Sequence, residues 1–367
     1  MAAAGDPVVA VRSSASNEDT GQASAAGQYD TFLGIHGLDA IAAAVQACRA
    51  SLRSDRATAY RKDAPPPAMA VIIQHHVDAD ISGVLFTSPD GSTLIESSWG
   101  LGPSIVEGRV TPDRYKVHNG TVTSTIADKP TALHRDGTRL VTRPVPTPQR
   151  RTPTLSNTTA QHLSTLATQA ATAFGTPQDI EWSITTNTIW LLQSRPITTH
   201  PPTPTHNPTA PTPPARPASS TPPTRQAPST PPVRFTETTN LAGASAASVS
   251  STDSEPGSTL TGTPASHGTA TGPARIVRGP ADFASVCPGD ILICPHTDPA
   301  WTPLLSIAAG VITETGGMLS HAAIVAREQG IPAVVAIPHA TARIPTGSGV
   351  TLNGSTGAVH LSPASET

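Results

Sequence analysis

A proline-rich segment separates two blocks of ordinary globular composition in this chain of 367 residues. Between Pro201 and Pro232 there are 13 prolines in 32 residues, and none of these residues is acidic. Packing of so few apolar side chains cannot offset the entropy of ordering the segment. With the Ser/Thr/Ala-rich stretch that follows, it predicts an extended linker over 198–265, which is a spacer or, as an alternative, a partner-binding tract.

The flanking blocks, 1–197 and 266–367, both combine strand-like and helical patterns, so the predicted fold class is α+β or α/β. Helical periodicity covers Leu38–Leu52 and Ala160–Phe174 in the first block. Two runs around a short polar turn predict a hairpin, Glu181–Ile184 with Thr188–Leu192. The other expected strands are Val8–Val11, Ala70–Gln74, Gly83–Thr87, Thr93–Glu96, Ala274–Val277, Ile291–Cys294, Val311–Thr313, Ala333–Ile337 and Val350–Leu352.

Charge and cysteine content restrict the compartment and the partners. The net charge is −3, so electrostatics favour neither nucleic acid nor an anionic membrane as a partner. The three cysteines (Cys48, Cys287 and Cys294) lack the spacing of a metal site. No apolar run approaches the ~18 residues of a spanning helix. These features predict a soluble, cytoplasmic protein without a membrane partner.

The stretch Thr313–Glu328 carries the strongest chemical signal in the chain. Gly316 and Gly317 allow a sharp turn, Ser320 is a candidate helix cap, and His321 falls in the first turn of an Ala/Ile/Val helix. Free N–H groups at a helix N-terminus favour a bound anion such as phosphate. A histidine held there can accept a phosphoryl group on its ring nitrogen. The alternative is an ordinary histidine in the capping turn of a surface helix.

This stretch, its continuation to Val335, and the segment His296–Leu304 resemble the phosphohistidine domain of the PEP-utilising enzymes. That family includes pyruvate phosphate dikinase, PEP synthase and rifampicin phosphotransferase. The resemblance covers about 268–361 and implies a swivelling β/β/α domain in which His321 is phosphorylated.

The first block begins with an arginine at a strand end, Arg12, which can make paired hydrogen bonds to a phosphate. Alone this is a weak motif. Together with Gln74–Thr87, Glu96–Gly102 and Glu107–Asp113, it resembles the ATP-grasp nucleotide domain of the same enzymes. The resemblance implies that ATP binds here, with Arg12, Gln74 and Val77 among the binding residues. His75 and His76, adjacent on a strand, face opposite sides and do not predict a shared metal.

The predicted hairpin ends in a group of polar side chains. Gln193 and Arg195 are two apart and share a face of their strand, and the hairpin register can set Glu181 beside them. A carboxylate and an amide oxygen can hold Mg²⁺ against ATP phosphates, and the arginine can neutralise developing charge. The matching family motifs imply Glu181 and Gln193 as metal ligands and Arg195 as a phosphate-binding residue. The alternative is an ordinary Glu–Arg cross-strand pair.

Two departures from the family pattern affect the expected function. The lobe that precedes the arginine motif in relatives is expected to be absent here, which makes the ATP-grasp domain partial. No acceptor-substrate domain is expected either. The leading interpretation is an ATP-dependent phosphotransferase that passes a phosphoryl group through His321 to pyruvate, a rifamycin or another small molecule. The alternatives are a non-catalytic nucleotide-binding or scaffold remnant, and a split enzyme whose partner subunit supplies the missing lobe.

Overall fold

The computed structural model describes residues 7–18, 27–61, 65–202 and 259–362. The predicted mixture of helices and sheets is confirmed, and each strand and helix expected above is present within a few residues of its predicted bounds. Most of the predicted linker, 203–258, lies outside the described residues. Its predicted C-terminal end is wrong, because Thr259–Thr261 and Thr263–Ser266 form strands β12 and β13.

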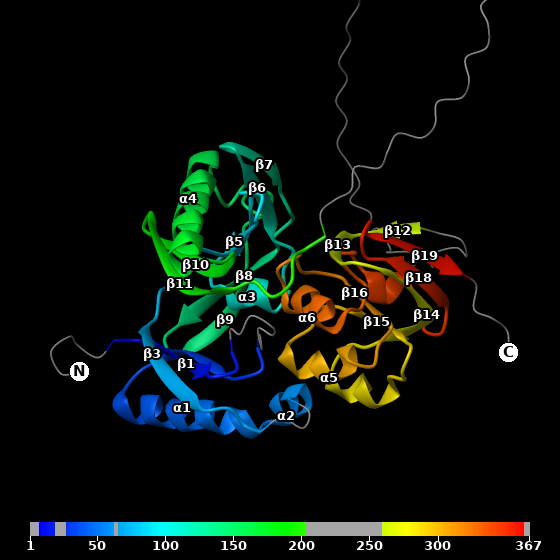
Figure 1. Ribbon diagram of the computed structural model, residues 1–367, viewed down its shortest axis with the longest axis horizontal. Helices are drawn as coiled ribbons and strands as arrows, with labels where there is room; N and C mark the ends of the chain where they lie inside the picture. Colours follow the sequence, from blue (N-terminus) through cyan, green and yellow to red (C-terminus); the bar gives the residue numbers. More distant parts are fainter. Residues whose placement is uncertain (1–6, 19–26, 62–64, 203–258, 363–367) are drawn as a thin grey trace, which may run out of the picture. The chain divides into compact units, whose positions relative to one another are not determined.

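A small antiparallel sheet with strand order β2-β1-β3 opens the first block, and helix α1 packs on one of its faces (Figure 1). Val9 and Val11 of β1 are buried with Ile41 and Cys48 of α1. Because side chains alternate along a strand, Arg12 lies on the face away from this helix. The elements are β1 (Val9–Ala15), β2 (Thr31–Ile35), α1 (Leu38–Ala50), a 3₁₀ turn (Ser51–Arg53), α2 (Asp55–Arg61) and β3 (Met69–His75).

A six-stranded antiparallel sheet, ordered β11-β10-β4-β5-β6-β7, follows and carries helix α4 on one face (Figure 1). Trp182 and Leu163 are fully buried between them. Helix α4 is capped at its N-terminus by Ser156, whose hydroxyl accepts the Thr159 N–H (3.1 Å), and at its C-terminus by left-handed Gly175. The elements are β4 (Ile81–Thr87), β5 (Thr93–Trp99), α3 (Pro103–Val106), β6 (Asp113–His118), β7 (Thr121–Thr125), a separate hairpin of β8 (Thr131–Asp136) and β9 (Arg139–Pro144), α4 (Asn157–Phe174), β10 (Gln178–Thr185) and β11 (Thr188–Pro196).

The second block is built on an eight-stranded mixed sheet, ordered β12-β19-β18-β14-β15-β16-β17-β13. Strands β14 to β17 are parallel to one another, and apolar clusters cover both faces of the sheet. Helix α6 connects parallel strands β16 and β17 (Figure 1). The remaining elements are β14 (Thr269–Ile276), a 3₁₀ turn (Pro280–Ser285), β15 (Ile291–Cys294), a 3₁₀ turn (Pro299–Trp301), α5 (Thr302–Leu305), β16 (Gly310–Thr313), α6 (His321–Gln329), β17 (Ala333–Val335), α7 (Ala340–Arg343), β18 (Gly349–Asn353) and β19 (Ala358–Ser362).

None of the helices described here has both the length and the apolar character that crossing a membrane would require.

Candidate functional site

His321 and Thr297 meet because both follow the carboxyl ends of neighbouring parallel strands. Thr297 comes shortly after β15, and His321 opens α6 after β16. Loops at the carboxyl ends of parallel strands converge, which makes this edge the usual ligand site of such sheets. Thr297 Oγ1 lies 3.0 Å from His321 Nδ1, and both side chains are buried.

The turn before α6 has the glycine geometry that the sequence predicts, but its serine acts differently. Gly316 has a left-handed φ of 108°, which suits a residue without Cβ. Ser320 occupies the N-cap position, yet its hydroxyl donates to the Gly317 carbonyl (2.8 Å) and makes no side-chain cap. The expected hydroxyl cap is therefore wrong, while the expected first-turn position of His321 is confirmed.

His321 is a buried, neutral imidazole with one nitrogen left over. Its side chain is only 3% exposed, which contradicts the alternative of a surface-helix histidine. Burial lowers the pKa of His321 to about 4, and the charge of Arg56 acts in the same direction. Nδ1 faces the Thr297 hydroxyl, whereas Nε2 has no hydrogen-bond partner among the described residues. When a hydrogen bond at Nδ1 fixes the orientation of a neutral imidazole, Nε2 can be left unprotonated, and an unprotonated Nε2 is a competent nucleophile.

Residues of the first block lie next to the histidine. A Cβ added at Gly27 would lie 3.7 Å from His321 Cδ2. The neighbouring Gln28 is buried and its amide donates to Thr302 Oγ1 (3.2 Å). Arg56 donates to the Gln28 carbonyl (3.0 Å) and pairs with Asp30. The histidine therefore lies against a loop of the first block that a nearby arginine supports.

The depressed pKa of His321 predicts an acid-dependent loss of stability. Between pH 6.5 and 4 the unfolded chain binds a proton at this histidine and the folded chain does not, so the free energy of unfolding falls as pH falls. The full contribution is about 3 kcal/mol. Urea unfolding at several pH values should show a shallower pH slope for His321→Gln than for the wild type. The exposed-strand control His360→Ala should keep the wild-type slope, and equal slopes for wild type and His321→Gln would contradict the assignment.

A second group of predicted residues meets where the small sheet contacts edge strand β11. In the hairpin register, Glu181 stands directly opposite Gln193, which confirms the expected pairing. Arg12 donates to Gln193 Oε1, and the Gln74 amide donates to the Leu192 carbonyl (3.3 Å). The structure thus brings Arg12, Gln74, Glu181 and Gln193 together.

The ordinary cross-strand pair takes a different form from the one expected. Arg195 Nε donates to Asp179 Oδ2 (2.8 Å), so this arginine makes a cross-strand ion pair with Asp179, the residue opposite it in the hairpin register. Burial raises the pKa of Asp179, and Arg195 opposes that rise. Val77 lies half-buried in the connection between β3 and β4.

His75 and His76 occupy opposite environments, as strand alternation predicts. His75 is exposed at the end of β3, whereas His76 is buried and its Nε2 lies 3.4 Å from Asp78. In the part of the chain that the structure describes, no three His, Cys, Asp or Glu side chains form a metal cluster.

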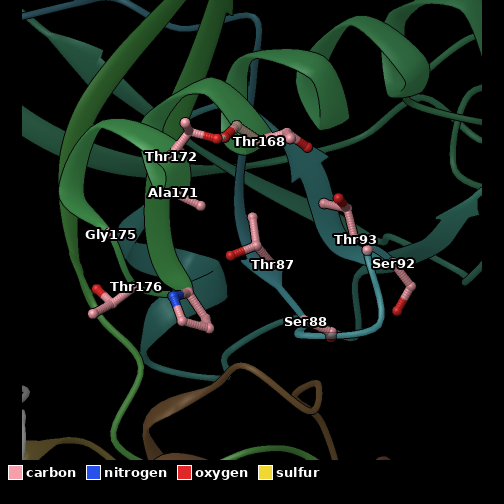
Figure 2. Close-up of a pocket in the computed structure, with 11 residues that line it drawn as sticks. Thr87, Ser88, Ser92, Thr93, Thr168, Ala171, Thr172, Gly175 and Thr176 are labelled. Atoms are coloured by element: carbon pink, nitrogen blue, oxygen red, sulfur yellow. Dashed lines mark hydrogen bonds between the residues drawn. The ribbon is translucent and has the colours of Figure 1, made fainter.

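A separate hollow lies between the end of α4 and the turn joining β4 to β5 (Figure 2). Its volume is about 350 Å³, and hydroxyl side chains dominate its lining. Those hydroxyls are largely engaged with the protein: Thr93 pairs with Ser164 (2.8 Å), and Thr172 donates to the Thr168 carbonyl (2.8 Å). None of the predicted site residues lines it, so the two groups described above remain the candidate site.

Two family models match this chain. Residues 1–213 match the pyruvate phosphate dikinase AMP/ATP-binding domain, and residues 286–357 match the mobile domain of PEP-utilising enzymes. The chain belongs to the pyruvate phosphate dikinase AMP/ATP-binding family. His321 lies inside the mobile-domain match, and the Arg12–Gln193 group lies inside the AMP/ATP-binding match.

The curated relatives carry the name phosphoenolpyruvate synthase. A probable phosphoenolpyruvate synthase of Methanothermobacter thermautotrophicus is 34% identical over 366 residues, covering 97% of this chain and 47% of that protein. One of Archaeoglobus fulgidus is 34% identical over 363 residues, covering 96% and 43%. The phosphoenolpyruvate synthase of Escherichia coli is 33% identical over 382 residues, covering 96% and 43%. The chain thus spans a little under half the length of these relatives.

Three further residues of this dikinase-family chain contact the candidate site residues or their loop, although the sequence alone assigned them no role. Thr297 contacts the histidine, Asp179 pairs with Arg195, and Glu96 binds the loop before His321. Thr297 and Glu96 fall in motifs that resemble the family, but the motif does not say what each side chain contacts. One signal was available for Glu96: it is a carboxylate among small and apolar strand residues. Such a position predicts a buried charge, and a buried charge needs a partner.

Proposed function

We propose that this chain binds ATP and carries a phosphoryl group in an ATP-dependent phosphotransferase of the phosphoenolpyruvate synthase type. The observation that supports it best is the buried, neutral His321, whose Nδ1 faces Thr297 and whose Nε2 is left without a partner. In transfer, the Nε2 lone pair forms a bond to the β-phosphorus of ATP while the bond from that phosphorus to the α–β bridging oxygen breaks and AMP leaves. Water then cleaves the β–γ linkage, which releases the γ-phosphoryl group as phosphate and leaves one phosphoryl group on Nε2. Over the whole family cycle ATP gives AMP and phosphate, and the phosphoryl group passes from the histidine to the acceptor.

The nucleotide would lie beside Arg12, Gln74, Val77 and Arg195. Glu181 and Gln193 fit Mg²⁺, because they are paired across the hairpin and Mg²⁺ prefers few protein oxygens plus phosphate oxygens. Gln193 Oε1, which accepts from Arg12, keeps a second lone pair for the metal. Glu181 has no hydrogen bond or ion pair to its carboxylate among the described residues, so it is available to a cation. Mg²⁺ held there would neutralise charge on the phosphates.

The relatives favour pyruvate or phosphoenolpyruvate as the small molecule at the other end of the transfer. The ATP-grasp architecture, the swivelling of the second block about a linker, and a partner polypeptide that completes the nucleotide site are parts of the same proposal. A cytoplasmic location agrees with the low cysteine content.

Loss of the proposed metal ligand should weaken ATP binding only when Mg²⁺ is present. For Glu181→Gln we expect at least about a tenfold loss of ATP affinity with Mg²⁺, and no loss in EDTA. Isothermal titration calorimetry on the full chain measures both. Glu107→Gln, which removes a carboxylate paired with Arg109, is the matched control and should bind as the wild type does. An equal loss with and without Mg²⁺ would assign Glu181 a structural role instead.

A further inference from the structure

A buried carboxylate of the first block binds the backbone immediately before His321. Glu96 lies on β5 and is 1% exposed. Its Oε1 accepts the Met318 N–H (2.8 Å) and its Oε2 accepts the Leu319 N–H (3.0 Å). Both lone-pair sets of the carboxylate are thus directed at two successive amides of the histidine loop, which is a strong, charge-assisted arrangement.

The same loop is held from its own side by an arginine. Arg327 of α6 donates from Nη1 to the Met318 carbonyl (2.8 Å) and to the Ala265 carbonyl (2.8 Å). Arg327 is 9% exposed. Burial raises the pKa of Glu96, and the charges of Arg114 and, to a smaller extent, Arg327 oppose that rise. The Met318 residue is therefore fixed at its N–H by the first block and at its C=O by the second.

We propose that Glu96 is a positioning residue that docks the His321 loop onto the nucleotide-binding block and releases it when the carrier must leave. The inference rests on the proposed function, because only a histidine that visits two places needs a reversible contact. It goes beyond that function by naming the side chain that specifies the docked position.

The chemistry of this contact suits a reversible interface. Val84, Phe86 and Ile105 of the first block form an apolar cluster with Leu319 and Ile324 of the second. Apolar contact alone would favour a permanent core. A charge buried against two residues of this cluster, Met318 and Leu319, loses its hydration on docking, and that cost cancels much of the attraction. On release, water replaces both amide donors at Glu96, so the undocked state is not left with unsatisfied groups.

Gly317 makes the contact possible. A Cβ added to Gly317 would overlap with the Glu96 carboxylate, and all three of its nearest atoms belong to that side chain. The φ of Gly317 is not left-handed, so its backbone conformation alone does not require glycine. Gly317→Ala should therefore disturb docking only through Glu96.

Hydrogen exchange with mass spectrometry on the full chain tests the proposal through the peptide 314–328. Glu96→Ala is expected to speed exchange at Met318 and Leu319 about tenfold, and Glu96→Gln by less, because its amide oxygen still accepts one N–H. Diethyl pyrocarbonate should modify His321 faster in Glu96→Ala than in the wild type. Asp136→Asn, which removes an exposed carboxylate paired with Arg143, should leave both rates unchanged. The buried strand Ile291–Cys294 should stay protected in every variant, which shows that the fold is intact.

The pair of substitutions gives the deciding result. Gly317→Ala alone should speed exchange as Glu96→Ala does, and it should add nothing in the Glu96→Ala background. Additive effects, or unchanged exchange in Glu96→Ala, would overturn the docking role. If Glu96→Ala does not fold, Gly317→Ala and Glu96→Gln still decide the question. None of these measurements uses ATP, so an unphosphorylated His321 would refute the proposed function while leaving the docking result to stand by itself.

Discussion

Label from β-labelled ATP is expected on the peptide that contains His321, and His321→Ala should lower it at least about a thousandfold. The structure gives the reason. Of the two ring nitrogens of His321, Nε2 has no hydrogen-bond partner among the described residues, and the imidazole is neutral above its pKa of about 4. The bond formed is a phosphoramidate, so the label should be lost on acid treatment. Peptide mapping after a neutral-pH digest measures its position.

The experiment needs one sample with an added nucleotide-binding protein and a control variant at a different histidine. The full chain is incubated with Mg²⁺ and β-labelled ATP, alone and mixed with the nucleotide-binding part of a phosphoenolpyruvate synthase. His360→Ala removes a histidine on strand β19 and should label as the wild type does. Thr297→Val should retain labelling at a reduced rate, because the hydroxyl orients Nδ1 and does not react. Label that survives His321→Ala, or no label on the wild type in either arm, would refute the carrier role.

Asp113→Ala is expected to destabilise the fold by about 3–5 kcal/mol. Asp113 and Lys129 are both fully buried, and Lys129 Nζ lies 2.6 Å from Asp113 Oδ1. The carboxylate also accepts the N–H groups of Ala127 (2.9 Å) and Thr154 (2.9 Å), which ties two loops to strand β6. Removing it leaves a buried ammonium with only the Ala127 carbonyl, and such a charge is far costlier than the lost bonds.

Chemical denaturation of the single variants and of a double variant measures this effect. Asp113→Leu combined with Lys129→Met should cost less than the sum of the two single changes, because no charge is then left unpaired. Asp136→Asn, which breaks an exposed ion pair with Arg143, should leave the denaturation midpoint unchanged. If Asp113→Ala lowered the free energy of unfolding by less than about 1 kcal/mol, water would have to reach Lys129, and the ion pair would not be shielded from solvent.

Local signals predicted the backbone around His321 and the hairpin well. Glycines followed by a helix pattern indicated the turn and the position of His321, because backbone freedom and helix periodicity are properties of neighbouring residues. The spacing of Gln193 and Arg195 indicated a shared face, and a short polar turn indicated the hairpin that sets Glu181 opposite Gln193. The roles of Arg12, Gln74, Val77 and Arg195 towards ATP, and of Glu181 and Gln193 towards Mg²⁺, stay predictions.

Local patterns could not predict contacts between residues that lie far apart in the sequence. The alternative considered from the sequence was a Glu181–Arg195 pair, whereas the register sets Arg195 opposite Asp179, with which it forms an ion pair. Lysine side chains usually lie on the surface, yet Lys129 is completely buried beside Asp113 of β6. The C-terminal part of the expected linker forms strands because β12 finds a partner in β19 and β13 in β17, which lie about 70 to 100 residues further along the chain.

The sequence by itself determined the helices and strands, the mixed α/β class, the histidine turn and the polar end of the hairpin. Each of these depends on interactions within about ten residues, so composition, spacing and periodicity carry the information. Only the tertiary structure decided which nitrogen of His321 is left free, that Thr297 holds the other, and that Glu96 binds the loop before it. Those contacts join residues 24 to 223 positions apart, and burial at such contacts sets the protonation of His321, a property that no local pattern records.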